Sequence, residues 1–202
     1  MVLQYMEFHH KIALTDEMSA ACDALVEGRM VVLAGTRAGP VVMMAAGAIT
    51  PRSVNFMARE ARGLLGMALT PRKAAMLGLS LQPRRGAAER PLYTVSIEAR
   101  EGVETGISSA DRARTIRAAT ECETGDMIVT PGHIFPQISE GDTRGQADCA
   151  LALLRAAGLP PVAALCSMIG AEGATPSDTE ARAFAAAHGL VCVDAMTIAP
   201  LV

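Results

Sequence analysis

The sequence is poor in aromatic residues, and tryptophan is absent. Aromatic residues make up only 3% of the 202 residues, whereas 50% are hydrophobic, so Ala, Val, Leu and the 12 Met must fill the core. No basic run is interleaved with aromatic side chains, and the formal net charge is −3. These absences argue against a nucleic-acid partner, because proteins of that kind usually present clustered Lys and Arg.

Long hydrophobic runs and paired cysteines are also missing. No apolar stretch is long enough to span a bilayer and no N-terminal signal pattern is present, so we expect no membrane partner. The five cysteines are odd in number and include no Cys-x-x-Cys pair. We therefore expect free thiols in a reducing compartment and a cytoplasmic location.

Hydrophobic periodicity and capping signals predict helices that alternate with strands. Helices are expected at 16–27, after the Thr50-Pro51 and Thr70-Pro71 caps, and at 108–119, 145–157 and 177–189. Strands are expected at 30–33, 41–46, 63–69, 92–99, 133–138, 162–169 and 190–193, with a connector at 121–130 and a candidate lid at 84–90. This alternation predicts a layered α/β fold in a single domain over residues 1–202, with residues 1–12 as a frayed segment.

Three neighbouring segments carry a recognisable signature. They read Leu92-Tyr93-Thr94-Val95-Ser96-Ile97-Glu98-Ala99, Thr105-Gly106-Ile107-Ser108-Ser109-Ala110-Asp111-Arg112 and Pro131-Gly132-His133-Ile134-Phe135-Pro136. Together with ordered matches over nearly the whole chain, they closely resemble the 3,4-dihydroxy-2-butanone 4-phosphate synthase family, riboflavin-pathway enzymes that act on ribulose 5-phosphate. The resemblance implies an α/β (α+β) fold class, as an α-β-α sandwich with a mixed sheet, and a homodimer with active sites close to the dimer interface.

Four positions depart from residues that the resemblance links to the family's chemistry. Where the family has an acidic loop that supplies a metal ligand, this chain has residues 34–40, and where the family has a reactive Cys, it has Gly66. Gln146 stands in place of the metal-binding His of the family's Gly-His-Thr-Glu motif, and Ser167 stands in place of a Glu late in the chain. Mg²⁺ prefers oxygen ligands, usually carboxylates, and neither the loop nor Gln146 supplies one. We therefore expect no cofactor, although the family would use Mg²⁺, and leave open whether Arg37 or Arg144 replaces the metal's charge.

His133 and Glu98 are the candidate catalytic residues. An imidazole can exchange a proton near neutral pH, and the resemblance places the matching histidine in the family's active site. We favour an acid–base role for His133 over a structural histidine bonded to backbone. Glu98 could orient or deprotonate a neighbouring group, although a glutamate that ends a strand is more often solvated.

The candidate substrate-binding residues are polar side chains of the matching segments, namely Arg59, Arg62, Thr94, Ser96, Thr105, Ser108, Asp111 and Gln146. Arginine forks suit a phosphate or carboxylate, although surface ion pairs would use the same residues. Backbone N–H groups in the turn before the helix at 108–119 can hold an anion, whereas Ser108 can equally be an ordinary helix cap. No residue is predicted to bind a metal.

Three functional hypotheses follow. The leading one is a repurposed, metal-independent enzyme that catalyses proton transfer, elimination, isomerisation or cyclisation on a less charged small molecule. A second is a conventional 3,4-dihydroxy-2-butanone 4-phosphate synthase that uses rearranged ligands such as Asp142, Asp148 or Glu172. A third is a non-catalytic binding or partner subunit.

Overall fold

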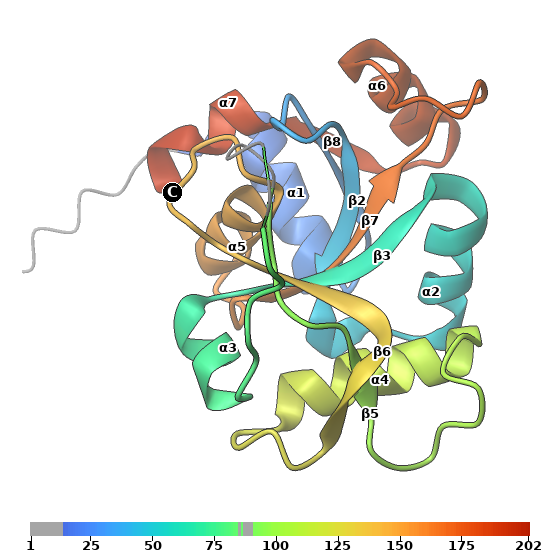
Figure 1. Ribbon diagram of the computed structural model, residues 1–202. Coiled ribbons are helices and arrows are strands. Elements are labelled where there is room, and N and C mark those ends of the chain that lie inside the picture. The colour runs from blue at the N-terminus through green and yellow to red at the C-terminus, as the bar shows by residue number, and fades with distance from the viewer. Residues whose placement is uncertain (1–13, 85, 87–90) are drawn as a thin grey trace, which may run out of the picture.

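An eight-stranded mixed sheet runs through the middle of the molecule (Figure 1). The computed structural model describes residues 14–84, 86 and 91–202, so our expectations for 1–12 and for most of the candidate lid lie outside the described residues. The strands are β1 Val31–Ala34, β2 Val41–Ala45, β3 Arg62–Leu69, β4 Leu92–Tyr93, β5 Ile97–Ala99, β6 Ile128–Ile138, β7 Val162–Met168 and β8 Val191–Asp194. Their order is β4-β6-β3-β7-β2-β1-β8, with β5 also paired to β6.

Helices cover both faces of the sheet (Figure 1). They are α1 Asp16–Val26, α2 Pro51–Phe56, α3 Pro71–Met76, α4 Ser109–Glu121, α5 Gln146–Ala156, α6 Asp178–Ala187 and α7 Ala195–Ile198, with short turns η1 Ala46–Ala48, η2 Met57–Ala61 and η3 Ala199–Leu201. One core lies between the sheet and α1, α5 and α7, and the other between the sheet and α2, α4 and α6. The pairs β1–β8 and β3–β6 are parallel and the remaining pairs are antiparallel, which confirms the mixed α-β-α sandwich.

Methionine fills the two cores, as the shortage of aromatic residues predicts. Met18, Met43, Met57 and Met67 are each at most 2% exposed. Unbranched, flexible side chains of this kind can pack into irregular gaps without imposing a ring shape. In the described part of the chain, no helix combines the length and the apolar character needed to cross a membrane.

Local capping signals agree with the structure. The Thr50 and Thr70 hydroxyls accept backbone N–H groups at the starts of α2 and α3, and each helix has proline at its first position. Ser177 and Glu180 form the predicted capping box of α6. These helix starts depend on neighbouring residues alone, which is why the sequence predicts them correctly.

The predicted strand at 92–99 is wrong in its middle. It divides into β4 and β5, because Thr94 forms an isolated bridge with Leu81 and the Val95 N–H donates to the carbonyl of Ser80. The predicted connector at 121–130 is also too long, since β6 begins at Ile128, where it pairs with β5. Both errors come from pairing with distant segments, which local periodicity does not report.

Candidate functional site

Strands β5 and β6 bring the two predicted catalytic residues into contact. The Nδ1 atom of His133 lies 2.7 Å from Oε2 of Glu98, although the two residues are 35 positions apart. The Glu98 side chain is 11% exposed and that of His133 is 45% exposed. The arrangement is a buried carboxylate that holds one side of an imidazole, while much of the ring remains accessible from solvent.

Thr115 on α4 holds the other oxygen of Glu98, and sequence reasoning missed this residue. Its fully buried hydroxyl donates to Oε1 of Glu98 at 2.7 Å and accepts the Ala99 N–H at 3.0 Å. With both carboxylate oxygens engaged, an ionised Glu98 keeps a proton on Nδ1 of His133 and leaves Nε2 with a lone pair. No local sequence signal pointed to Thr115, because its contact with Glu98 depends on how α4 packs against β5.

A tight turn closes over this pair. Gly106 adopts a left-handed φ of 76°, and a Cβ at this position would overlap Oε2 of Glu98 and lie 2.6 Å from Nδ1 of His133. The Asp111 carboxylate accepts the N–H groups of Gly106 at 3.0 Å and Glu104 at 3.4 Å. Asp111 therefore anchors the backbone of the turn that contacts the His133–Glu98 pair.

The N-terminus of α4 supports the same turn. Ser108 caps the helix by accepting the Asp111 N–H at 3.0 Å. Desolvation acts to raise the pKa of Asp111, but its hydrogen bonds with Ser108 and with the backbone of residues 104–106 hold that pKa below its usual range. Thr105 and Ser108 are exposed in this segment. Backbone N–H groups in the first turn of a helix lack intrahelical acceptors, so an incoming anion could bind here.

The other predicted substrate-binding residues lie in different surroundings. Ser96 accepts the N–H of Gly132 at 3.1 Å and so supports the backbone beside His133. Thr94 is fully buried and donates to the carbonyl of Val95. Arg59 forms an exposed ion pair with Glu60 at 2.6 Å. Arg62 donates to the carbonyl of Gly170 at 3.1 Å.

Three of the four departing positions meet in one small cavity. Gly66 on β3, Gln146 at the start of α5 and Ser167 on β7 line it together, along with Phe135. A Cβ on Gly66 would overlap the carbonyl oxygen of Phe135. The space that a cysteine side chain would need is therefore occupied by the neighbouring strand, and Gly66 does not enlarge the cavity.

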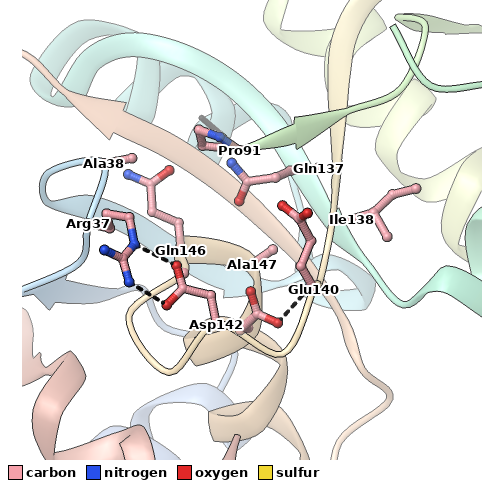
Figure 2. A pocket seen from close by; sticks show the side chains of 11 residues that line it. Arg37, Ala38, Pro91, Gln137, Ile138, Glu140, Asp142, Gln146 and Ala147 are labelled. Carbon is pink, nitrogen blue, oxygen red and sulfur yellow. Dashed lines mark hydrogen bonds and ion pairs between the residues drawn. The ribbon is translucent and has the colours of Figure 1, made fainter. Parts of the chain in front are cut away.

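A larger cavity of about 190 Å³ adjoins Gln146 (Figure 2). Arg37 contributes two hydrogen bonds to the Asp142 carboxylate, at 2.8 and 3.1 Å, and these hydrogen bonds lower the pKa of Asp142. Arg144 donates to the carbonyl of Gly35 at 2.9 Å, and Gln146 donates to that of Gly39 at 2.8 Å. These contacts join the 34–40 loop to the segment before α5.

Glu140 and Asp148 add further carboxylates to the lining of this larger cavity. Oδ1 of Asp148 accepts the N–H groups of Glu140 at 2.9 Å and Gly141 at 2.7 Å. Burial raises the pKa of Asp148 despite these hydrogen bonds, and the nearby charge of Asp142 acts in the same direction. The wall therefore concentrates negative charge in a partly desolvated place.

Comparison with known proteins shows a consistent likeness. A 3,4-dihydroxy-2-butanone 4-phosphate synthase from Cupriavidus pinatubonensis is 39% identical over 194 residues, which cover 92% of this chain and 86% of that protein. A protein of the same name from Pseudomonas aeruginosa is 42% identical over 155 residues. That match covers 74% of this chain but only 42% of the relative, so the chain spans less than half of that longer protein.

A solved structure corrects our expectation of no cofactor. It is described as 3,4-dihydroxy-2-butanone 4-phosphate synthase in complex with two magnesium ions, with a TM-score of 0.82 and 27% identity over 91% of this chain and 95% of that one. The expectation was wrong because it considered only the 34–40 loop and Gln146. The carboxylates of Asp142 and Asp148, which the conventional reading already considered, line the adjacent cavity together with that of Glu140.

The positions that the resemblance assigns to metal ligands do not themselves fit a magnesium ion. The 34–40 segment contains no carboxylate, and the neutral Gln146 amide donates its N–H to Gly39. Among the described residues, no group of three or more His, Cys, Asp and Glu side chains is arranged to hold a metal. We therefore derive no chemical step through a metal at these positions.

The family likeness covers both site regions. A family model described as 3,4-dihydroxy-2-butanone 4-phosphate synthase matches residues 19–201. This range contains the His133–Glu98 pair, the turn at Gly106 and the cavity beside Gln146. The chain belongs to the 3,4-dihydroxy-2-butanone 4-phosphate synthase family.

Proposed function

We propose that this protein is a 3,4-dihydroxy-2-butanone 4-phosphate synthase, a lyase that acts on ribulose 5-phosphate in riboflavin biosynthesis. The main support is family membership over residues 19–201, combined with the 2.7 Å contact between His133 and Glu98. This proposal takes precedence over our leading hypothesis of a repurposed enzyme, because the curated relatives share this one name.

The proposed chemistry begins with proton transfer at a carbon next to a carbonyl group. His133 is the base, and Nε2 receives the proton because Glu98 engages Nδ1. Glu98 then stabilises the imidazolium that forms, while Thr115 keeps the carboxylate oriented. The phosphate of the substrate is placed at the exposed turn before α4, whose N–H groups favour an anion.

A formate assay tests this proposal directly. Metal-stripped protein is incubated with ribulose 5-phosphate, with and without added Mg²⁺, and formate is measured. We expect formate release with added Mg²⁺, as from the Cupriavidus pinatubonensis relative assayed in parallel. Absence of formate under both conditions, while that relative is active, would contradict the proposal.

A second candidate function is proton transfer on a different, less charged small molecule. The observation that favours it is the replacement of reactive and charged groups by Gly66, Gln146 and Ser167, which line one cavity. A cavity with fewer charges suits a more apolar ligand. The formate assay separates the two candidates, since this one predicts no formate. A non-catalytic partner role stays a prediction from the sequence.

We further propose that the protein works as a homodimer. Ile107, which follows Gly106, is 55% exposed, and Val129, which pairs with Glu98, is 36% exposed. Apolar surface therefore flanks the site. We expect light scattering after size exclusion to give twice the chain mass of 21.0 kDa. Ile107→Ser should shift the protein toward monomer, whereas Val26→Ser, at a residue 60% exposed on α1, should not. A monomeric wild type would refute this proposal.

A cytoplasmic location completes the proposed function. All five cysteines are free, and Cys22, Cys122, Cys149 and Cys166 are buried. Burial raises the pKa of Cys166 to about 11, which suits an inert core thiol. Free thiols of this kind are usual in a reducing compartment.

A further inference from the structure

We propose that a cavity between α4 and the end of β5 binds a nucleoside monophosphate, whose phosphate is held by the guanidinium groups of Arg114 and Arg117. The cavity shares no lining residue with the His133–Glu98 pair or with the two cavities beside Gln146, so the inference goes beyond the proposed function. Its test measures binding without ribulose 5-phosphate. Its failure would therefore be distinguishable from a failure of the formate assay.

The cavity has the size and the walls of a small-molecule site. Its volume is about 370 Å³, and ligand pockets usually enclose about 300–1,000 Å³. One wall is a stripe of α4 at helical spacing, formed by Arg114, Arg117, Ala118 and Glu121. The other wall comes from the turn after β5 and the segment before β6, which lie beside α4 (Figure 1).

Three guanidinium groups line this cavity, and two of them have no ionic partner. Arg100 donates through Nη2 to the carbonyl of Ile128 at 3.3 Å and through Nε to that of Asp126, so the backbone holds it in place. Within the described part of the chain, Arg114 and Arg117 form no ion pair. They are three residues apart on α4, so like charges lie on one face of the helix. A bound oxyanion would relieve this repulsion.

The turn after β5 fixes the position of Arg114. Gly102 adopts a left-handed φ of 72°, and a Cβ there would lie 2.8 Å from both Cζ and Nη1 of Arg114. The guanidinium therefore lies directly against this turn, in space that a larger residue would occupy. A planar guanidinium can bind a phosphate through two parallel N–H groups, and little entropy is lost when it is already held in place.

Carboxylates in the same lining favour a ligand that also carries hydroxyl groups. Glu101, Glu121 and Asp126 line the cavity, and Asp126 accepts the Thr124 hydroxyl. Glu121 follows Arg117 by four residues, which is the weaker order for an ion pair on a helix. Acidic side chains bind ribose hydroxyls in dinucleotide-binding proteins. A sugar phosphate would thus satisfy both signs of charge, whereas the carboxylates would repel inorganic phosphate.

The rest of the lining is apolar and suits the flat base of a nucleotide. Ala99 and Ala118 are 2% and 7% exposed and contribute the buried part, while Met127 is 47% exposed. Methionine adapts its shape to a ring, and a guanidinium can stack on an aromatic face. Phosphate, ribose and base together use each kind of lining residue, which is why we propose a nucleoside monophosphate.

Calorimetric titration of the full-length protein with AMP tests the proposal. We expect one AMP bound per chain. Inorganic phosphate and adenosine should each bind at least about tenfold more weakly than AMP, because each lacks part of the recognised molecule. Arg114→Gln and Arg117→Gln should each weaken AMP binding by about tenfold or more, a change of about 1.4 kcal/mol.

A matched arginine elsewhere on the surface is the control. Arg52 is exposed on α2 and does not line the cavity, so Arg52→Gln should leave the affinity for AMP unchanged. Circular dichroism confirms that each variant is folded. Absence of AMP binding by the wild type would overturn the proposal. So would AMP binding that persists in both Arg114→Gln and Arg117→Gln, or binding of phosphate or adenosine as tight as that of AMP.

Discussion

Replacement of His133 by glutamine should lower kcat/KM for ribulose 5-phosphate by about 10²- to 10⁴-fold, the usual contribution of a positioned acid–base group. Glutamine keeps a polar side chain but cannot take up a proton at neutral pH. The loss corresponds to about 3–5 kcal/mol of transition-state stabilisation. Initial rates of formate release at several substrate concentrations measure it. The same rates should fall in Glu98→Gln, because a neutral amide no longer stabilises the imidazolium.

A second histidine provides the matched control. The His188 ring packs against Phe184 at a centroid distance of 4.4 Å and against Phe56 at 5.2 Å, beyond the C-terminus of α6. His188→Gln should therefore change stability slightly and leave kcat/KM within about twofold, since surface changes away from a site have small effects. A His133→Gln enzyme with wild-type turnover would show that the pair is structural.

Restoration of the family's cysteine in Gly66→Cys should destabilise the protein and should not increase activity. A Cβ at this position overlaps the carbonyl oxygen of Phe135, the residue opposite Gly66 in the parallel β3–β6 pair. Overpacking of a closely packed interior costs about 1–3 kcal/mol, and sometimes more. For a chain of this length, the melting temperature should fall by about 2–4 °C for each kcal/mol. Thermal unfolding followed by circular dichroism measures the shift.

Gly47→Cys is the comparison variant for this experiment. Gly47 lies in η1, and a Cβ there meets no atom within 4 Å. Under reducing conditions its melting temperature should stay close to that of the wild type. An unchanged melting temperature in Gly66→Cys would mean that β3 and β6 separate easily at this point, and a gain in formate release would mean that the lost thiol alone limits the reaction.

The fold was predictable where its determinants are local. Thr50, Thr70 and Ser177 begin helices through contacts within four residues, and the sequence predicts all three. The division of the 92–99 strand was not predictable, because it depends on where Thr94 meets Leu81. The extra residues of β6 likewise depend on pairing with β5, which brings together segments about 30 residues apart in the chain.

The residues of the site were easier to predict from the sequence than the contacts between their side chains. His133 and Glu98 stand out through the family resemblance, yet only the β5–β6 pairing places their side chains 2.7 Å apart. Gln137 carried no signal, because one polar residue in a strand usually faces solvent, whereas this one is 3% exposed. The expectation of no cofactor rested on the 34–40 loop and Gln146 alone, and a related structure that holds two magnesium ions overturned it.

The absence of tryptophan has a useful experimental consequence. Tyr93 is one of only two tyrosines in the sequence, and it lines the small cavity together with Gln137 and Gln146. Burial raises its pKa, so the phenol stays protonated over the neutral range. The near-ultraviolet emission of the native protein therefore comes essentially from tyrosine, and one of the two tyrosines lines this small cavity. We expect a ligand that enters this cavity to change the intrinsic fluorescence, which can be followed without a label and without a background from indole rings.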